Sequence, residues 1–81
     1  MNEFDEIIDT LESLKSDLSV KVKSEINYII EILKKEDFSE SDIIEIQDKI
    51  EEISELGVDQ FTRNELYNVG SILEGYLELI N

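Results

Sequence analysis

The third apolar stretch of the chain, residues 39–56, reads SESDIIEIQDKIEEISEL and decides which kind of fold is expected. Its isoleucines recur at steps of three and four residues, which places them on one face of an α-helix. They are Ile43, Ile46, Ile50 and Ile53. Ser39 and Asp42 have the spacing of a capping box, and Gly57 stands where a left-handed residue ends a helix. The stretch therefore predicts a helix over residues 40–56.

Three further stretches show the same helical spacing, over residues 3–17, 20–35 and 60–80. Their apolar lines are Phe4, Ile7, Ile8, Leu11, Leu14 and Leu18, then Val22, Ile26, Ile29, Ile30 and Leu33, then Leu66, Val69, Leu73, Leu77 and Ile80. Tyr28 and Ile32 are expected on the flank of the second line. These lines predict the core faces of three more helices.

The helix starts and the connections indicate how the helices are arranged. Ser19 is expected to cap the second helix, and Asp59 the last, with Thr62 as an alternative cap for the last. No proline interrupts the chain, and connections of a few residues favour antiparallel neighbours. We therefore expect an all-α fold: an up-and-down antiparallel four-helix bundle that forms a single domain over residues 1–81.

The composition argues against most kinds of catalytic and metal chemistry. Without histidine or cysteine, the chain lacks the usual general base, a thiolate nucleophile, disulfides and thiolate zinc sites. It also lacks the Glu-x-x-His motif of di-metal bundles, and the acidic residues 37–42 lack the glycine of an EF-hand loop. An enzyme would need a buried carboxylate with a raised pKa. We expect no catalytic residue, no metal site and no cofactor.

The chain is strongly acidic, with 21 acidic residues against 7 basic ones and a net charge of −14. Phosphate backbones would be repelled, so we expect no direct nucleic-acid binding. A hydrophobic content of 41 % is too high for a disordered chain, although no apolar run is long enough to span a membrane. We expect a cytoplasmic protein. The charge serves solubility, or it attracts a basic protein partner and imitates nucleic acid.

An acidic stripe is expected on the outer face of the third helix, opposite its isoleucines. It consists of Glu45, Asp48, Glu52 and Glu55. Neighbouring like charges on a helix are mutually destabilising. The stripe is either a solvated surface or a docking strip for a lysine- and arginine-rich partner.

An uncharged strip is expected on the outer face of the fourth helix. It consists of Asn64, Tyr67, Asn68, Ser71 and Gly75. Gly70 and Gly75 each lower helix propensity by about 1 kcal/mol relative to alanine. Either these small residues let another helix of the same fold approach closely, or the strip binds a partner or a second copy of the chain, with Tyr67 as aromatic anchor.

The helix ends and the last helix also carry a family pattern. Its residues are Asp17, Ser19 and Val20, then Glu52-Ile53-Ser54, Arg63, Tyr67-Asn68, Ser71 and Leu73-Glu74. Over about residues 10–76 the chain resembles the archaeal uncharacterised protein family zero-one-four-seven. The resemblance implies a bromodomain-like four-helix bundle without an established biochemical activity. The chain departs from the family in lacking the prolines that open the second and fourth helices, in having Tyr67 in place of tryptophan, and in a shorter last connection.

These observations favour a small acidic protein-interaction domain, an adaptor or accessory protein without catalytic activity. We expect a protein partner to bind the uncharged strip. The acidic surroundings of the strip would suit a partner that is basic. A homodimer through the same strip is an alternative. The other alternative is an acidic inhibitor or nucleic-acid mimic that occupies a basic groove of its partner through the acidic stripe.

Overall fold

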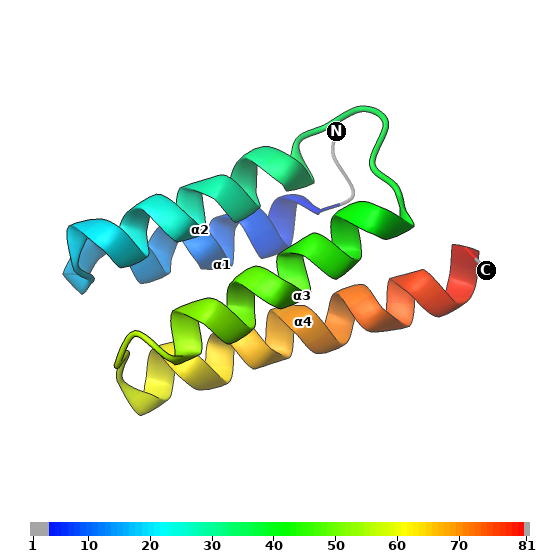
Figure 1. The fold of residues 1–81 in the computed structure, drawn as a ribbon. Helices are drawn as coiled ribbons and strands as arrows, with labels where there is room; N and C mark the ends of the chain where they lie inside the picture. The colour runs from blue at the N-terminus through cyan, green and yellow to red at the C-terminus, as the bar shows by residue number, and fades with distance from the viewer. Residues whose placement is uncertain (1–3, 81) are drawn as a thin grey trace. The chain divides into compact units, whose positions relative to one another are not determined.

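The computed structural model describes residues 4–80, which are all-helical and contain no strand (Figure 1). The elements are α1 (Asp5–Leu14), the 3-10 helix η1 (Lys15–Asp17), α2 (Val20–Leu33), α3 (Glu40–Ser54) and α4 (Gln60–Ile80). The predicted all-α chain with four α-helices is confirmed. The expected start of the first helix at residue 3 lies outside the described residues, as does the side chain of Ile80.

The chain divides after Phe38 into two compact units, each of which is a helical hairpin. The first hairpin, Met1–Phe38, contains α1, η1 and α2, and the second, Ser39–Asn81, contains α3 and α4. Within each hairpin the chain reverses through a short connection, so that the two helices run antiparallel and side by side (Figure 1). Short connections of this kind are typical of antiparallel helix neighbours.

In the first hairpin, the buried side chains follow most of the predicted apolar lines. Leu11 of α1 and Ile26 of α2 are fully buried, whereas Leu18 is only partly buried. Ile32, which was expected on the flank of α2, is buried as well. The rings of Phe4 and Phe38 meet with a centroid distance of 4.7 Å, which closes the end of the hairpin opposite its turn.

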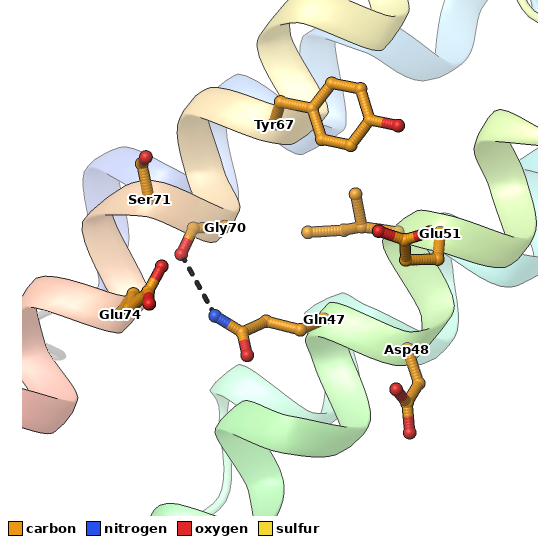
Figure 2. A pocket seen from close by; sticks show the side chains of 8 residues that line it. Gln47, Asp48, Glu51, Tyr67, Gly70, Ser71 and Glu74 are labelled. Carbon is orange, nitrogen blue, oxygen red and sulfur yellow. Dashed lines mark hydrogen bonds between the residues drawn. The ribbon is translucent and has the colours of Figure 1, made fainter.

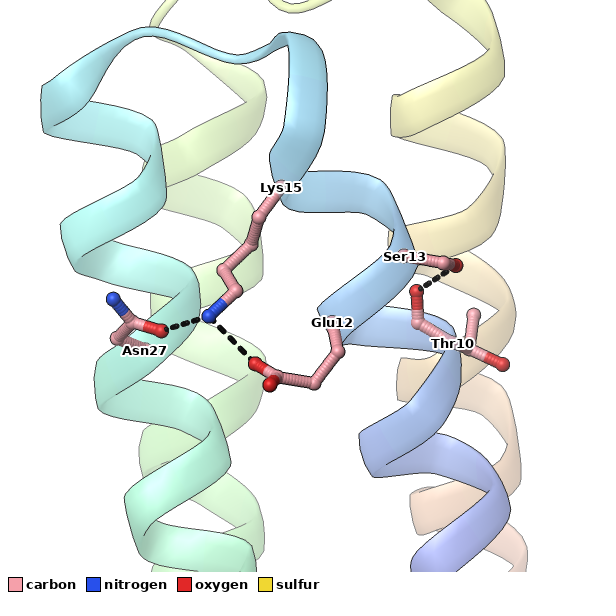
Figure 3. Close-up of polar contacts among 5 residues, drawn as sticks. All are labelled: Thr10, Glu12, Ser13, Lys15 and Asn27. Carbon is pink, nitrogen blue, oxygen red and sulfur yellow. Dashed lines mark hydrogen bonds and ion pairs between the residues drawn. The ribbon is translucent and has the colours of Figure 1, made fainter.

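The turn of the first hairpin is held by a lysine that contacts both helices (Figure 3). The Nζ of Lys15 lies 2.6 Å from Glu12 Oε1 and donates a hydrogen bond of 2.7 Å to Asn27 Oδ1. The hydrogen bond from Lys15 is the main reason why the pKa of the Glu12 carboxyl is lowered. α1 ends at Leu14, and the chain continues as the tighter 3-10 helix η1. The sequence had predicted that the α-helix would continue to residue 17.

The second hairpin begins with the predicted capping box. The backbone N–H of Ser39 donates to Asp42 Oδ2 at 2.9 Å, and residue Asp42 is buried, at 6 % exposed. An acidic group in this position also suits the positive end of the helix dipole. At the other end, α3 stops at Ser54, and Gly57 has φ +82°, so its predicted role as a left-handed helix terminator is confirmed.

The start of α4 settles which of two predicted residues caps it. The side chain of Asp59 accepts hydrogen bonds from the Thr62 hydroxyl and from backbone N–H groups of the first turn, and these lower the pKa of the Asp59 carboxyl. Thr62 itself is buried inside the first turn of the helix. Asp59 is therefore the cap, and Thr62 supports it from within the helix.

Among the described side chains, the predicted core lines of α3 and α4 are buried except for Leu77. The buried residues are Ile43, Ile46, Ile50 and Ile53 of α3 and Leu66, Val69 and Leu73 of α4. Leu77, near the C-terminal end of α4, is only partly buried. The opposite faces of both helices are consequently the surfaces on which a functional site can form.

Candidate protein-interaction surface

The predicted uncharged strip lies on α4, and all of its side chains are exposed. Its members are Asn64, Tyr67, Asn68, Ser71 and Gly75. Tyr67 is 46 % exposed, so part of this large residue is accessible to another molecule. The helix holds these residues on the side opposite Leu66 and Leu73, because successive residues turn by about 100° around its axis.

Three large apolar residues that were not assigned to this strip lie beside it. Phe61 is 65 % exposed, Ile72 51 % and Leu79 84 %. The steps of 11 and 7 residues between them bring all three to the same side of α4. The sequence contained the signal, because none of the three fits the core line of the fourth helix. We refer to these three residues and the predicted strip together as the α4 face.

The two glycines of α4 have different surroundings. A Cβ on Gly70 would lie 3.5 Å from the Cδ1 of Ile50, which is a van der Waals contact between α4 and α3. A Cβ on Gly75 would meet nothing within 4 Å. A Cβ would therefore be tolerated at Gly70 as an ordinary contact with α3, and it would stand in open space at Gly75.

A groove of about 730 Å³ runs between α3 and α4 on the side of Gly70 (Figure 2). Its lining residues are Gln47, Asp48, Ile50 and Glu51 of α3 and Tyr67, Gly70, Ser71 and Glu74 of α4. The side-chain amide of Gln47 reaches across the groove to the Gly70 carbonyl oxygen at 3.5 Å. The groove thus joins two residues of the uncharged strip, Tyr67 and Ser71, to one residue of the acidic stripe, Asp48.

The acidic stripe of α3 is less uniform than its spacing suggested. Asp48, Glu52 and Glu55 are exposed, but Glu45 is partly buried. Glu52 forms an ion pair of 3.6 Å with Lys49, which reduces the local negative charge. Only Asp48 of the four stripe residues lines the groove. The groove draws its other two carboxylates from Glu51 and Glu74, which the sequence reading did not single out.

Neither a metal-binding cluster nor a membrane-spanning helix is found among the described residues. Within residues 4–80, no three histidine, cysteine, aspartate or glutamate side chains are arranged to hold a metal ion. None of the helices described has the length and apolar character needed to cross a membrane. The pKa values of the Glu12 and Asp59 carboxyl groups are lowered, in each case mainly by a hydrogen bond from a neighbouring side chain, Lys15 and Thr62 respectively. What the surface offers is shape, charge and exposed apolar area.

No protein-family model, curated protein or solved structure matches this chain.

Proposed function

We propose that this chain is a non-catalytic protein-interaction domain, an adaptor or accessory module that binds a partner protein through the α4 face. The observation that carries the proposal is the exposure of Phe61, Ile72 and Leu79 along one side of a helix. Large exposed apolar patches mark interaction sites in soluble proteins. The three side chains form a row along one side of α4, about 16 Å and about 10 Å apart along the helix axis. A cytoplasmic location and membership of family zero-one-four-seven belong to the same proposal.

The polar residues of the α4 face are of kinds that suit a protein interface. Asn64, Asn68 and Ser71 are uncharged, so a partner can cover them without removing a charge from water. Tyr67 combines a large apolar ring with a hydroxyl, and tyrosine is enriched among the residues that dominate interfaces. The open position at Gly75 leaves room for a partner's backbone to approach the helix.

The arrangement of the two hairpins is part of the proposal. An isolated hairpin of about 40 residues buries too little surface to be stable on its own without disulfides, metals or association. We therefore infer that the hairpins pack as an up-and-down antiparallel four-helix bundle in one domain. This arrangement is also what the family resemblance implies.

The proposal is tested by affinity capture from a lysate of the source organism, with the captured proteins quantified by mass spectrometry. The native chain is compared with Asn68→Arg, which places a long charged side chain on the α4 face. Ser24→Arg, at an exposed position of α2, is the matched control. We expect a partner that is retained by the native chain and the control and lost with Asn68→Arg. A partner that all three baits retain equally would contradict the proposal.

The same samples test the homodimer alternative. If the partner is a second copy of the chain, the native protein is a dimer in solution and Asn68→Arg is a monomer. Sedimentation equilibrium measures this directly. A native chain that stays monomeric at high concentration rules out self-association through the α4 face.

A second candidate function is an acidic inhibitor or nucleic-acid mimic that enters a basic groove of its partner. The net charge of −14 and the exposure of Asp48, Glu52 and Glu55 favour it. Replacing Glu45 and Asp48 together by alanine should then abolish capture of the partner, and moderate salt should do the same. If the α4 face is the binding surface, the double variant retains most of the partner and Asn68→Arg does not.

A further inference from the structure

The charged residues that line the groove between α3 and α4 are all negative. Three carboxylates line it, those of Asp48, Glu51 and Glu74, and no lysine or arginine does. Within residues 4–80, none of these three side chains forms a hydrogen bond or an ion pair. This differs from Glu12 and Glu52, whose charges are balanced by lysines at 2.6 Å and 3.6 Å. The groove therefore presents negative charge that the described part of the chain does not neutralise.

The groove also has an aromatic wall. The ring of Tyr67 extends from α4 on the side of the groove where Glu51 stands on α3 (Figure 2). A cation over the face of a tyrosine ring gains about 0.5–1 kcal/mol at an exposed site. Carboxylates on both helices together with an aromatic ring are the combination that recognises an organic cation.

We propose that this groove takes an arginine side chain from a basic segment of the partner protein. This inference rests on the proposed function, because Tyr67 and Ser71 belong to both the groove and the α4 face. Charge complementarity selects the occupant: the lining carries only negative charge on a chain of net charge −14, which disfavours an acidic segment or a second copy of the chain.

Arginine suits this lining better than lysine does. Its guanidinium is planar, so it stacks on the Tyr67 ring while its N–H groups point outward in the ring plane. Those N–H groups can donate to carboxylate oxygens of the lining, such as those of Glu51 beside the ring. Lysine offers one compact charge and no stacking surface. A volume of about 730 Å³ accommodates an arginine side chain with its flanking residues.

The test is a titration of the full-length ¹⁵N-labelled chain with acetylated tri-arginine amide, followed by NMR. Tri-citrulline amide, which has the same shape without the charge, and tri-lysine amide are the reference peptides. We expect shift changes concentrated at the Gln47 side-chain amide, at Gly70 and at Ser71, with weaker binding of tri-lysine and none of tri-citrulline. Shift changes spread evenly over the acidic residues of both hairpins would overturn the proposal.

Matched variants separate the groove from general acidity. Glu51→Gln combined with Glu74→Gln removes two groove charges, and Glu31→Gln combined with Glu36→Gln removes two exposed charges in the first hairpin. We expect the groove variant to bind tri-arginine about tenfold more weakly and the control to change affinity less than twofold. Tyr67→Leu should weaken binding about threefold, whereas Tyr67→Phe keeps the ring and should not. Equal losses in the groove variant and the control would refute the proposal.

The two proposals fail in different ways. If the captured partner is lost with Asn68→Arg but survives Glu51→Gln combined with Glu74→Gln, the α4 face binds the partner and the arginine inference is wrong. If Asn68→Arg retains the partner, the proposed function is wrong, while the tri-arginine titration still decides whether the groove recognises arginine.

Discussion

In the first hairpin, Lys15 sits between Glu12 and Asn27 at 2.6 and 2.7 Å, whereas in the second hairpin the carboxylates of the groove have no cation among the lining residues. The exposed apolar residues differ as well. Phe61, Ile72 and Leu79 lie along one side of α4, while the exposed large apolar side chains of α2 are Val20 and Tyr28. Polar contacts connect the two helices in each hairpin, through Lys15 in the first and through Gln47 and Arg63 in the second. The second hairpin also carries the groove and the exposed apolar residues of α4, and this difference is why we propose the binding site there.

The largest effects are expected in the cores, where the hairpins should behave alike. Leu11 of α1 and Leu73 of α4 are both fully buried, so Leu11→Ala and Leu73→Ala should each lower the free energy of unfolding by about 2–5 kcal/mol. Urea denaturation followed by circular dichroism measures this. In the proposed bundle both variants shift one common transition. Two separate transitions would show that the hairpins unfold independently and would contradict a single domain.

A smaller loss of stability is expected at the turn of the second hairpin. Gly57 has φ +82°, a conformation that is strained for any residue with a Cβ. Gly57→Ala should therefore lower the free energy of unfolding by about 1–2 kcal/mol, although its Cβ would meet no other atom within 4 Å. Thermal unfolding by circular dichroism is the measurement. An unchanged melting temperature would mean that the backbone relaxes to another turn.

The opposite sign is expected at Gly75, where the helix is regular and the space around the Cβ position is open. Gly75→Ala should raise the free energy of unfolding by up to about 1 kcal/mol because alanine is the better helix former. If a partner's backbone approaches this position, the same variant should capture less partner despite its greater stability. Higher stability with undiminished capture would remove Gly75 from the binding surface.

The smallest effect concerns the lysine of the first hairpin. Lys15→Met removes the main cause of the lowered pKa of Glu12, so that pKa should rise towards the ordinary value of 4.5. A folded-state pKa below the unfolded one contributes stability above the unfolded value, and this contribution is lost as the pH falls through the folded value. The melting temperatures of native and variant chains should thus differ slightly at neutral pH and converge in acid.

An NMR titration of the Glu12 carboxyl checks the change in pKa. Lys21→Met is the control, because it removes an exposed lysine from the start of α2. The control should leave the pKa of Glu12 where it is in the native chain. A similar rise in both variants would assign the lowered pKa to the general field rather than to the contact with Lys15.

The sequence predicted what depends on local periodicity. The isoleucine spacing of residues 39–56 predicted α3 and its buried face. The Ser39–Asp42 capping box and the Gly57 terminator could be predicted because helix ends favour these residue types at these positions. The tightening of α1 into η1 was missed, because no local residue pattern marks where an α-helix narrows its last turn.

The site was predicted only in part, for a related reason. Helical spacing places Tyr67 and Ser71 on the outside of α4, but the groove depends on how α3 and α4 are rotated against each other. That rotation shows in contacts between residues far apart in the chain, such as the hydrogen bond from Gln47 to the carbonyl oxygen of Gly70. The spacing of apolar residues within one helix does not reveal how that helix is rotated against its neighbour. For this reason Glu51 and Glu74 were not recognised as groove residues.

The most direct test of the α4 face compares one exposed apolar residue from each hairpin. Phe61 is 65 % exposed on α4 and Val20 is 83 % exposed on α2, so replacing either by serine removes apolar surface without opening the core. Quantitative affinity capture with Phe61→Ser and Val20→Ser as baits measures the consequence. We predict that Phe61→Ser loses the partner that the native chain captures and that Val20→Ser retains it. Equal retention by both variants, or loss with Val20→Ser alone, would contradict the assignment of the binding surface to α4.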